Sequence, residues 1–427
     1  MERVIALQLS SHLCFNKIIP NVQSGFKVGH SCNTALLKIV DDIMIASDKG
    51  HLTTLVLLDF TKAFDTINHK LLISILHYSG LSHTARKFMI SYLEDRVQAV
   101  STAGIMSKFL HTSCGVPQGS VLGPILFNIY ISTFPLALKH CTSHFYADDA
   151  QLYYSFDPSE VQLACHRINE DLTRIANVSK DHGLFLNSVK TQAILFGRDK
   201  HRLEAKGYVQ IAIGGKAISI EDCVNNLGLV VDSNLRFKNH ISRCIQRGYA
   251  SLKIIYRTRH LLTRMQKATL CNAMVLSGLN YCDTVYGPFL DSADIRKIQL
   301  LQNSCLRLIF GVRKFEPISY KLKELKWLNM KNRRFLHAAT VFHNIIINRS
   351  PSYLYEKITF RTDVHNLNLR FKGLLTPPTH VTQFFKRSFS YCIANIYNNL
   401  PENLKKLSLI SFKCKLRKFL LENQSRA

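Results

Sequence analysis

The stretch HFYADDAQLYY, residues 144–154, places two adjacent aspartates, Asp148 and Asp149, between apolar and aromatic runs. Carboxylates inside an apolar segment are costly unless something pairs with them. If the two runs are strands of a hairpin, the aspartates lie at its turn, where both side chains can crowd toward one edge of a sheet. Like charges that close raise each other's pKa or require a cation. The alternative is an ordinary Asp-Asp turn.

A third carboxylate, Asp59, lies near the end of TTLVLLDF, residues 53–60, which predicts a buried strand that ends at this aspartate. The alternative role is a helix N-cap or a strand-end turn. That alternative suits Asp65, which precedes a predicted helix, better than Asp59, which follows four apolar residues. Three carboxylates from two strands are what a two-metal phosphoryl-transfer site requires, and Mg²⁺ takes such hard oxygen ligands.

The segment CGVPQGSVLGPILFNIYI, residues 114–131, has three glycines and two prolines within ten residues, followed by an apolar run. Such a loop lets the backbone approach a ligand closely, and Gln118 offers both a donor and an acceptor. The apolar run could be a helix or a strand. A single glycine-rich loop is weak evidence by itself.

The positive charge of the chain is unevenly distributed. The net charge is +26, and residues 1–232 carry 21 Lys and Arg against 20 Asp and Glu, whereas residues 233–427 carry 34 against 9. Predicted helices and strands alternate in the first part, while the part after Phe237 is mostly helical. A basic surface binds phosphates in a salt-dependent manner, so the pattern favours a nucleic-acid partner over a merely solvated basic face.

Other sequence features limit the classes of protein to which the chain can belong. The 12 cysteines are scattered singly, which favours buried reduced thiols over zinc sites or disulfides. No run of 18 apolar residues predicts a membrane span, and the first residues lack the pattern of a signal peptide. The sequence therefore predicts an intracellular protein, in cytoplasm and nucleus, that is not secreted.

Several segments, in this order, resemble the palm motifs of reverse transcriptases: FTKAFDTINHKLL (60–72), GVPQGSVLGPILFNIYI (115–131), FYADD (145–149) and GLFLNSVKTQAILFG (183–197). The residues within these motifs are similar to those of non-LTR (LINE-type) retrotransposons of the jockey-like kind. Upstream, VQSGFKVGHSCNTALL (22–37) resembles the fingers of that family. Downstream, VNNLGLVVDSNLRFKNHI (224–241) resembles its primer-grip segment, although a simple edge hairpin is the alternative there. The resemblance covers almost the whole chain.

The resemblance implies a set of metal-binding residues. Asp59 matches the first metal-binding aspartate of the family, and Asp148 and Asp149 match its paired aspartates. The backbone carbonyl of Phe60 is a further implied ligand. The implied cofactor is a pair of Mg²⁺ ions, with Mn²⁺ as an alternative ion.

The resemblance also implies nucleotide-binding residues. Phe64 falls where the family has a bulky residue that excludes the ribose 2′-hydroxyl, although a core phenylalanine is a rival interpretation. Gln118 and Gly119 match a segment beside the incoming nucleotide. Lys190 matches a lysine proposed as general acid to pyrophosphate, or else it is a surface lysine before a strand. Lys27 stands where the family usually has arginine, so it would hold the triphosphate as a point charge without a bidentate fork.

The implied fold is an α+β right-hand polymerase. It would comprise partial fingers (1–50), a palm with an antiparallel sheet (51–232), a helical thumb-like region (233–290) and a basic helical C-terminal extension (291–427). The implied function is RNA-directed DNA polymerisation from a primer 3′-hydroxyl. Its partners would be an RNA template, a DNA primer, their RNA–DNA hybrid and dNTPs, with protein partners unknown.

Two alternatives remain open at this point. The first is a catalytically inactive nucleic-acid-binding remnant, because Met1 begins inside the fingers region and the endonuclease domain of full-length elements is not seen. On that ground we expect an N-terminally truncated chain. The second is another type of reverse transcriptase, such as an intron maturase, which the YADD box alone does not exclude.

Overall fold

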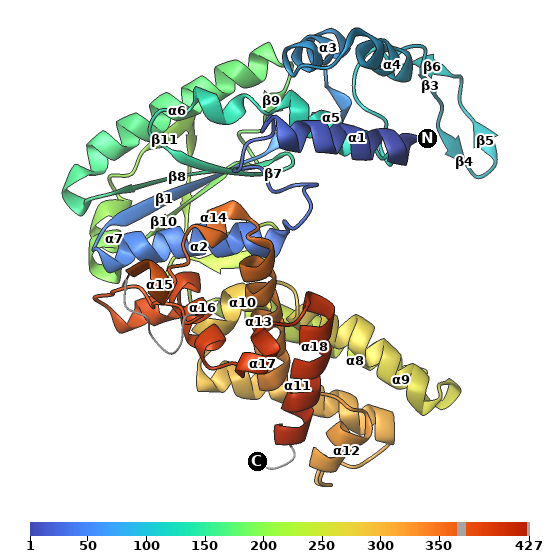
Figure 1. Ribbon diagram of the computed structural model, residues 1–427, viewed down its shortest axis with the longest axis vertical. Helices are drawn as coiled ribbons and strands as arrows, with labels where there is room; N and C mark the ends of the chain where they lie inside the picture. The colour runs from blue at the N-terminus through green and yellow to red at the C-terminus, as the bar shows by residue number, and fades with distance from the viewer. Residues whose placement is uncertain (365–372, 425–427) are drawn as a thin grey trace. The chain divides into compact units, whose positions relative to one another are not determined.

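The computed structural model describes residues 1–364 and 373–424. The chain forms two compact units (Figure 1). Unit 1 comprises Met1–Ser31 and Gly50–Glu221, and unit 2 comprises Cys32–Lys49 and Asp222–Ala427. In the described part of the chain, none of the helices is both long and apolar enough to cross a membrane.

Unit 1 is built on a five-stranded sheet in the order β13-β10-β1-β8-β7. Neighbouring strands are antiparallel except for the edge strand β13, which pairs with β10 in parallel. The strands are β1 (Leu52–Leu58), β7 (Thr142–Tyr146), β8 (Asp149–Phe156), β10 (Gln192–Phe196) and β13 (Ile220–Glu221). The predicted α+β class with an antiparallel sheet is thus confirmed.

The central strand β1 is apolar on both faces because both faces of the sheet are buried. Val56 and Leu58 point to the face whose core includes Leu152, and Leu55 on the opposite face is equally buried. A strand buried on both faces reads as a continuous apolar run and not as an alternating one. The helix α6 (Val161–Asp181) crosses the first face, and its buried residues recur at helical spacing (Figure 1).

The remaining elements of unit 1 are short. Its helices are α1 (Glu2–Phe15), α3 (His69–Tyr78), α4 (His83–Leu93), α5 (Gly123–Tyr130) and α7 (Asp199–Lys206), with 3-10 turns at Ala63–Asp65, Phe134–Ala137 and Pro158–Glu160. The small strands are β2 (Phe60–Thr61), β3 (Val97–Gln98), β4 (Ser101–Thr102), β5 (Ile105–Met106), β6 (Leu110–His111), β9 (Phe185–Leu186), β11 (Ile211–Ile213) and β12 (Lys216–Ile218). The apolar run after the glycine-rich loop is therefore the helix α5.

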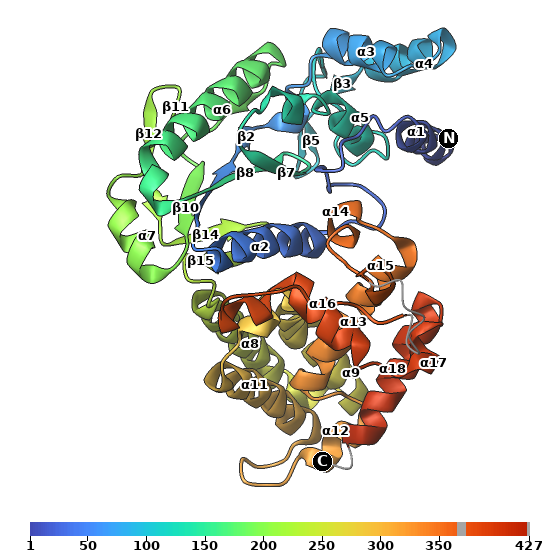
Figure 2. The ribbon, with the colours of Figure 1, turned by 60° about the vertical axis from the view of Figure 1, so that its left-hand side comes forward.

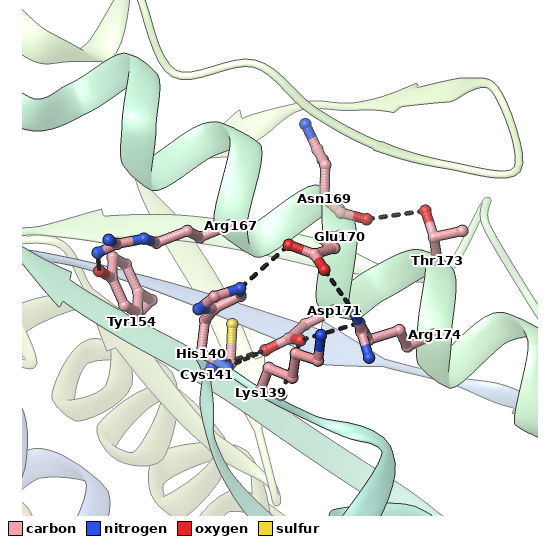
Figure 3. A network of polar contacts seen from close by, with 10 residues as sticks. All are labelled: Lys139, His140, Cys141, Tyr154, Arg167, Asn169, Glu170, Asp171, Thr173 and Arg174. Atoms are coloured by element: carbon pink, nitrogen blue, oxygen red, sulfur yellow. Dashed lines mark hydrogen bonds and ion pairs between the residues drawn. The ribbon is translucent and has the colours of Figure 1, made fainter.

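The start of β7 is fixed by a buried carboxylate on α6 (Figure 3). Asp171 accepts hydrogen bonds from the backbone N–H groups of Lys139, His140 and Cys141, at 2.9, 2.8 and 2.7 Å. Its side chain is fully buried, so these three donors replace water around the charge. Glu170 beside it bonds His140 and Arg174 at 3.0 and 2.6 Å. The strand that leads to the Asp-Asp turn thus begins at a defined position.

Unit 2 is mostly helical, as its sequence predicts. Its longer helices are α8 (Lys238–Arg257), α11 (Ser292–Phe310), α13 (Met330–Asn348), α16 (Phe389–Asn398) and α18 (Leu409–Gln424). Shorter ones are α9 (Arg264–Leu270), α10 (Asp283–Tyr286), α12 (Ser319–Glu324), α14 (Ser352–Tyr355), α15 (Arg361–Val364) and α17 (Glu402–Lys405), with a π-helical turn at Cys271–Leu276 and 3-10 turns at Arg259–Leu261, Ser277–Leu279, Gly287–Phe289 and Gln383–Arg387.

The predicted primer-grip segment forms a separate hairpin in unit 2. Strands β14 (Cys223–Asn226) and β15 (Leu229–Asp232) pair antiparallel around the two-residue turn Leu227–Gly228. Both turn residues have left-handed φ angles, 46° and 80°, as a tight hairpin turn requires. The hydroxyl of Tyr281 donates to the Leu227 carbonyl, so the tip of the hairpin is tied to the helical part of its own unit.

The helix α2 (Cys32–Asp48) belongs to unit 2 although it lies early in the sequence. It packs against α10, α14 and α16, of which α14 and α16 are labelled beside it in Figure 2. Most of its side chains are buried. A helix that is apolar on most sides needs such a complete enclosure. The predicted boundaries at residues 50 and 232 follow the sequence motifs and do not coincide with the two units, and the domain assignment stays a prediction.

Buried carboxylates fasten α2 to the C-terminal part of unit 2. Asp41 accepts from the N–H and hydroxyl of Ser390 at 2.9 and 2.7 Å and from Lys357 Nζ at 2.7 Å. Asp48 accepts from the N–H groups of Val381 and Thr382 at 2.8 and 2.7 Å. Each acid carries its charge in a buried position because several donors surround it.

We predict that Asp41→Ala destabilises the protein by about 3–5 kcal/mol, because it leaves Lys357 less neutralised and two buried donors of Ser390 unpaired. Urea unfolding monitored by circular dichroism measures this loss. The matched control is Glu324→Ala, which breaks the ion pair between Arg264 and Glu324, whose side chains are 54% and 45% exposed. That loss should stay below about 1 kcal/mol. Equal losses for the two variants would contradict the fastening role of Asp41.

Candidate active site at the β7–β8 turn

The two adjacent aspartates lie at a tight hairpin turn, as predicted. Tyr146 at the end of β7 pairs with Asp149 at the start of β8, so Ala147 and Asp148 alone form the turn. Ala147 is buried and has a left-handed φ of 54°. Two residues are too few for regular alternation, so the carboxylates of Asp148 and Asp149 share one end of the sheet.

The third aspartate lies at the same end of the neighbouring strand. Leu58 of β1 pairs with Ala150 of β8, and the next residue on β1 in this antiparallel register, Asp59, is level with Asp149. The backbone carbonyl of Asp59 accepts from Asn187 N–H at 2.8 Å. Its side-chain Oδ2 is buried and has no hydrogen-bond partner among the described residues. Such an atom is costly unless a cation meets it.

The three carboxylates influence one another electrostatically. Burial raises the pKa of Asp149 to about 6, and the charges of Asp148 and Asp59 contribute to the rise. Burial also raises the pKa of Asp148, again with a contribution from the charge of Asp59. The charged forms therefore oppose each other in the folded protein, and a bound cation would relieve this repulsion.

The donor set fits a divalent metal ion, although the side chains do not form a closed cage. Carboxylate oxygens are the ligands that Mg²⁺ takes, usually together with water and substrate phosphates. The buried Oδ2 of Asp59, which accepts no hydrogen bond among the described residues, and the raised pKa values of the other two aspartates are consistent with such a site. Across residues 1–364 and 373–424, no group of three or more Asp, Glu, His or Cys side chains converges as a ready-made metal centre.

Lys190 lies at the edge of this cluster. Its Nζ is 3.9 Å from Asp59 Oδ2, and its side chain is 70% exposed. Asn187 builds the turn that carries it, because Asn187 Oδ1 accepts from the N–H groups of Val189 and Lys190 at 3.1 and 3.2 Å. Since Asn187 also donates to the Asp59 carbonyl, one residue fixes both the lysine and the aspartate.

The glycine-rich loop is connected to the residues that follow Asp59. Gln118 Nε2 donates to Asp65 Oδ1 at 2.7 Å. Gly115 has a φ of 84°, and a Cβ there would lie 2.9 Å from the Asp65 carbonyl oxygen, so glycine is needed for this close approach. Gly119 has a φ of 83° and open space around it. The N-cap interpretation of Asp65 is wrong, because Asn68 caps α3 by accepting from Leu71 N–H at 3.1 Å.

The two phenylalanines after Asp59 have different environments. Phe60 is buried in β2, where it pairs with Leu186 of β9, so its backbone position next to Asp59 is fixed. Phe64 is half-buried, and its ring stacks on Phe127 with 4.3 Å between centroids. It meets the ring of Phe26 edge-on at 6.2 Å. Phe64 is thus held by packing on one side while part of its surface remains accessible.

Among the residues that the structure describes, no contact links Lys27 to the three aspartates. Its Nζ donates to the Pro20 carbonyl at 3.4 Å, and burial lowers the pKa of its ammonium group. The amine is therefore engaged by its own segment. Two residues that support the site, Asn187 and Gln23, were not predicted from the sequence, although both lie in segments that resemble the family. Both act through hydrogen bonds to the backbone of distant residues, which no local pattern reveals.

We predict that Asp149→Asn raises the melting temperature of the metal-free protein at pH 8. The folded-state pKa of about 6 lies above the usual value of 3.8, so the charged form opposes folding once the pH exceeds that usual value. The gain should be small at pH 4.5 and complete above pH 6. Added Mg²⁺ should stabilise the wild type but not the variant. Differential scanning fluorimetry measures both effects.

The control for this experiment is Asp181→Asn, which changes an exposed aspartate at the end of α6. It should change the melting temperature little at either pH and retain the response to Mg²⁺. A wild type and an Asp149→Asn variant with the same melting temperature at pH 8 would contradict the repulsion among the three carboxylates.

Comparisons with known proteins agree on one family. A family model described as "Reverse transcriptase (RNA-dependent DNA polymerase)" matches residues 1–231. The chain is 27% identical over 365 residues to an RNA-directed DNA polymerase from transposon X-element of Drosophila melanogaster, covering 84% of this chain and 38% of the relative. It is 25% identical to the RNA-directed DNA polymerase from mobile element jockey of the same species, covering 73% and 34%.

The matches also differ in extent. A COX1/OXI3 intron 2 protein of Saccharomyces cerevisiae is 26% identical over 144 residues, which is 33% of this chain, so the mobile-element relatives match a far longer stretch. Among solved structures, telomerase from Candida albicans, in complex with a fragment of telomeric RNA, has a TM-score of 0.41 at 14% identity, covering 83% of this chain and 55% of that one. This chain spans less than two fifths of the length of the X-element and jockey relatives.

Proposed function

Because the chain belongs to the reverse transcriptase (RNA-dependent DNA polymerase) family, we propose that it is an RNA-directed DNA polymerase derived from a non-LTR mobile element. Its α+β fold is that of a right-hand polymerase. It would extend a primer 3′-hydroxyl with dNTPs on an RNA template. The observation that carries the proposal is that Asp59, Asp148 and Asp149, all within the matched residues, meet at one end of a single sheet.

We propose that the three aspartates, with the carbonyl of Phe60, hold two Mg²⁺ ions during the reaction. Bound there, the ions would lower the pKa of the attacking hydroxyl and neutralise the charge that develops on the triphosphate. The 3′-hydroxyl would lose its proton to solvent, and its oxygen would bond to the α-phosphorus as the bond to pyrophosphate breaks. Lys190, whose Nζ is 3.9 Å from Asp59 Oδ2, would give a proton to the leaving pyrophosphate.

The nucleotide would lie beside the residues that follow Asp59. The accessible edge of Phe64, backed by Phe127, would meet the sugar and exclude a 2′-hydroxyl. Gln118, held by Asp65, and the open backbone at Gly119 would line the base and template side. Lys27 would serve the triphosphate only if it leaves the Pro20 carbonyl.

The basic unit 2 would bind the primer–template duplex through its phosphates. Arg and Lys side chains lie over aromatic rings there, as with Arg259 over Tyr256 at 3.9 Å. Lys321 lies over Phe310 at 4.5 Å. Cations that pack on rings keep their charge available at the surface, and backbone recognition needs no base contacts. An enzyme of this kind would be made in the cytoplasm and act on nuclear DNA.

We predict that purified protein with Mg²⁺ extends a DNA primer on an RNA template and that Asp148→Asn reduces extension to background. The substitution removes a charged ligand while it keeps the size of the side chain. Primer extension on a denaturing gel measures the effect. Extension that survives Asp148→Asn would contradict the metal assignment.

Hybrid binding separates this proposal from its rival, an inactive nucleic-acid-binding remnant. Asp148→Asn should bind the RNA–DNA hybrid nearly as well as the wild type. Affinity should fall by about 10³-fold or more between about 50 and about 200 mM salt, as expected for six or more phosphate contacts. Tight salt-sensitive binding without extension by the wild type would favour the remnant, a possibility raised by the absence of a closed metal centre among the described residues.

We predict that Phe64→Ala raises ribonucleotide incorporation, lowering the preference for dNTPs by roughly ten-fold. The ratio of kcat/KM for a dNTP and its rNTP measures the preference. The control is Phe88→Ala on α4, where the ring stacks on Tyr92, because it also removes a partly exposed stacked ring. Unchanged sugar discrimination in Phe64→Ala would return this residue to a purely packing role.

A further inference from the structure

Gln23 bonds the backbone of the turn that carries Asp148. The side chain is buried, with 3% exposure. Its Oε1 accepts from Ala147 N–H at 3.0 Å and from Gly25 N–H at 2.7 Å, and its Nε2 donates to the Ala147 carbonyl at 3.5 Å. One amide therefore engages both backbone groups of the residue that immediately precedes Asp148.

The segment Val22–Gly25, called the strap below, runs beside the end of β7. Phe145 N–H donates to the Val22 carbonyl, and Ser24 N–H donates to the Phe145 carbonyl, both at 2.8 Å. Ser24 Oγ and His144 Nε2 form a further buried hydrogen bond at 2.9 Å. The strap thus follows the strand to its last residues and brings Gln23 level with the turn.

The backbone of the strap packs directly against the backbone of the turn, with no room for a side chain at Gly25. A Cβ on Gly25 would lie 2.2 Å from the backbone nitrogen of Ala147, a distance that real atoms do not adopt. On its other side, Asn128 of α5 donates from Nδ2 to the Gly25 carbonyl at 2.7 Å. The strap is therefore enclosed between α5 and the turn, and Gln23 has no freedom to move away.

Ala147 needs this support because its conformation is unfavourable. A left-handed φ of 54° costs an alanine about 1–2 kcal/mol relative to the right-handed region. Strained conformations persist only where the surroundings determine them from several sides. Without the amide of Gln23, Ala147 can relax, and the direction in which the Asp148 side chain leaves the turn changes with it.

We propose that Gln23 is a positioning residue for the metal-binding carboxylates. Its amide holds Ala147 in the strained conformation, and this conformation keeps Asp148 and Asp149 directed at the same cation. The inference rests on the proposed function, because it assigns Gln23 a role only if the turn binds metal. Residues that orient metal ligands without touching the metal typically change its affinity 10–100-fold when they are replaced.

The test is direct metal binding by Gln23→Met, which keeps the volume of the side chain but removes the acceptor and the donor. Titration with Mn²⁺, followed by the electron paramagnetic resonance of the free ion, gives the affinity without any polymerase assay. We expect about ten-fold weaker binding or more. Hydrogen exchange of the metal-free variant should also be faster over residues 145–150.

The matched control is Asn169→Leu. Asn169 on α6 also bonds backbone groups on both sides, accepting from Ala212 N–H at 2.9 Å and donating to the Gln210 carbonyl at 3.1 Å. Its partners belong to β11 and the residue before it, so its loss should lower the melting temperature while Mn²⁺ affinity stays at the wild-type value. Equal Mn²⁺ affinity for wild type and Gln23→Met would overturn the positioning role and leave the proposed function standing.

A second variant perturbs the strap without removing any hydrogen-bonding group. Gly25→Ala removes no hydrogen-bonding atom but forces a methyl group against Ala147 N, so it should weaken Mn²⁺ binding by a comparable factor. Wild-type affinity in a folded Gly25→Ala variant would count against the inference. A wild type that binds no Mn²⁺ would overturn both the proposed metal site and the role of Gln23.

Discussion

The repulsion among three carboxylates at one end of a sheet is the constraint on which unit 1 depends. The pairing of β1 with β8 brings Asp59 level with Asp149, and the two-residue turn adds Asp148 beside them. Burial and mutual repulsion raise the pKa values of Asp148 and Asp149, so the folded state tolerates this arrangement only because other interactions hold it. Buried strands, the anchored start of β7 and the strap beside its end supply those interactions. Stability is given up at the place where the proposed cation would recover it.

Much of this arrangement follows from local sequence patterns. Apolar and aromatic runs on both sides of Ala-Asp-Asp predict the hairpin, and the run before Asp59 predicts its buried strand. The register that brings the two together is not encoded in the same way, because β1 is buried on both faces and its apolar residues do not alternate. The motifs predicted the family, which the match over residues 1–231 confirms. The roles of Phe64 and Lys190 stay predictions, since packing and proximity are all that their positions establish.

Other features could not be predicted because they depend on contacts between residues far apart in the sequence. Gln23 and Ala147 are separated by 124 positions, and a buried glutamine has no periodic signature. Asn187 reaches Asp59 through one backbone hydrogen bond. Lys27, assigned to the triphosphate from its motif, donates to the Pro20 carbonyl, a contact that the motif does not reveal, and its role stays a prediction. The N-cap role expected for Asp65 falls to Asn68, three residues later.

The burial of α2 among residues from the C-terminal part of the chain affects which shortened versions of the protein can fold. The helix lies within the residues that the family model matches, yet its buried acids are satisfied by Lys357, Val381 and Ser390. A premature stop codon near position 350 would spare every candidate catalytic residue, yet it would remove α14 and α16, which pack against this helix, together with the donors to its buried acids. Because α2 would then keep buried carboxylates without their partners, such a shortened chain should fold poorly. Intact catalytic motifs alone are therefore a poor guide to which shortened chains still fold.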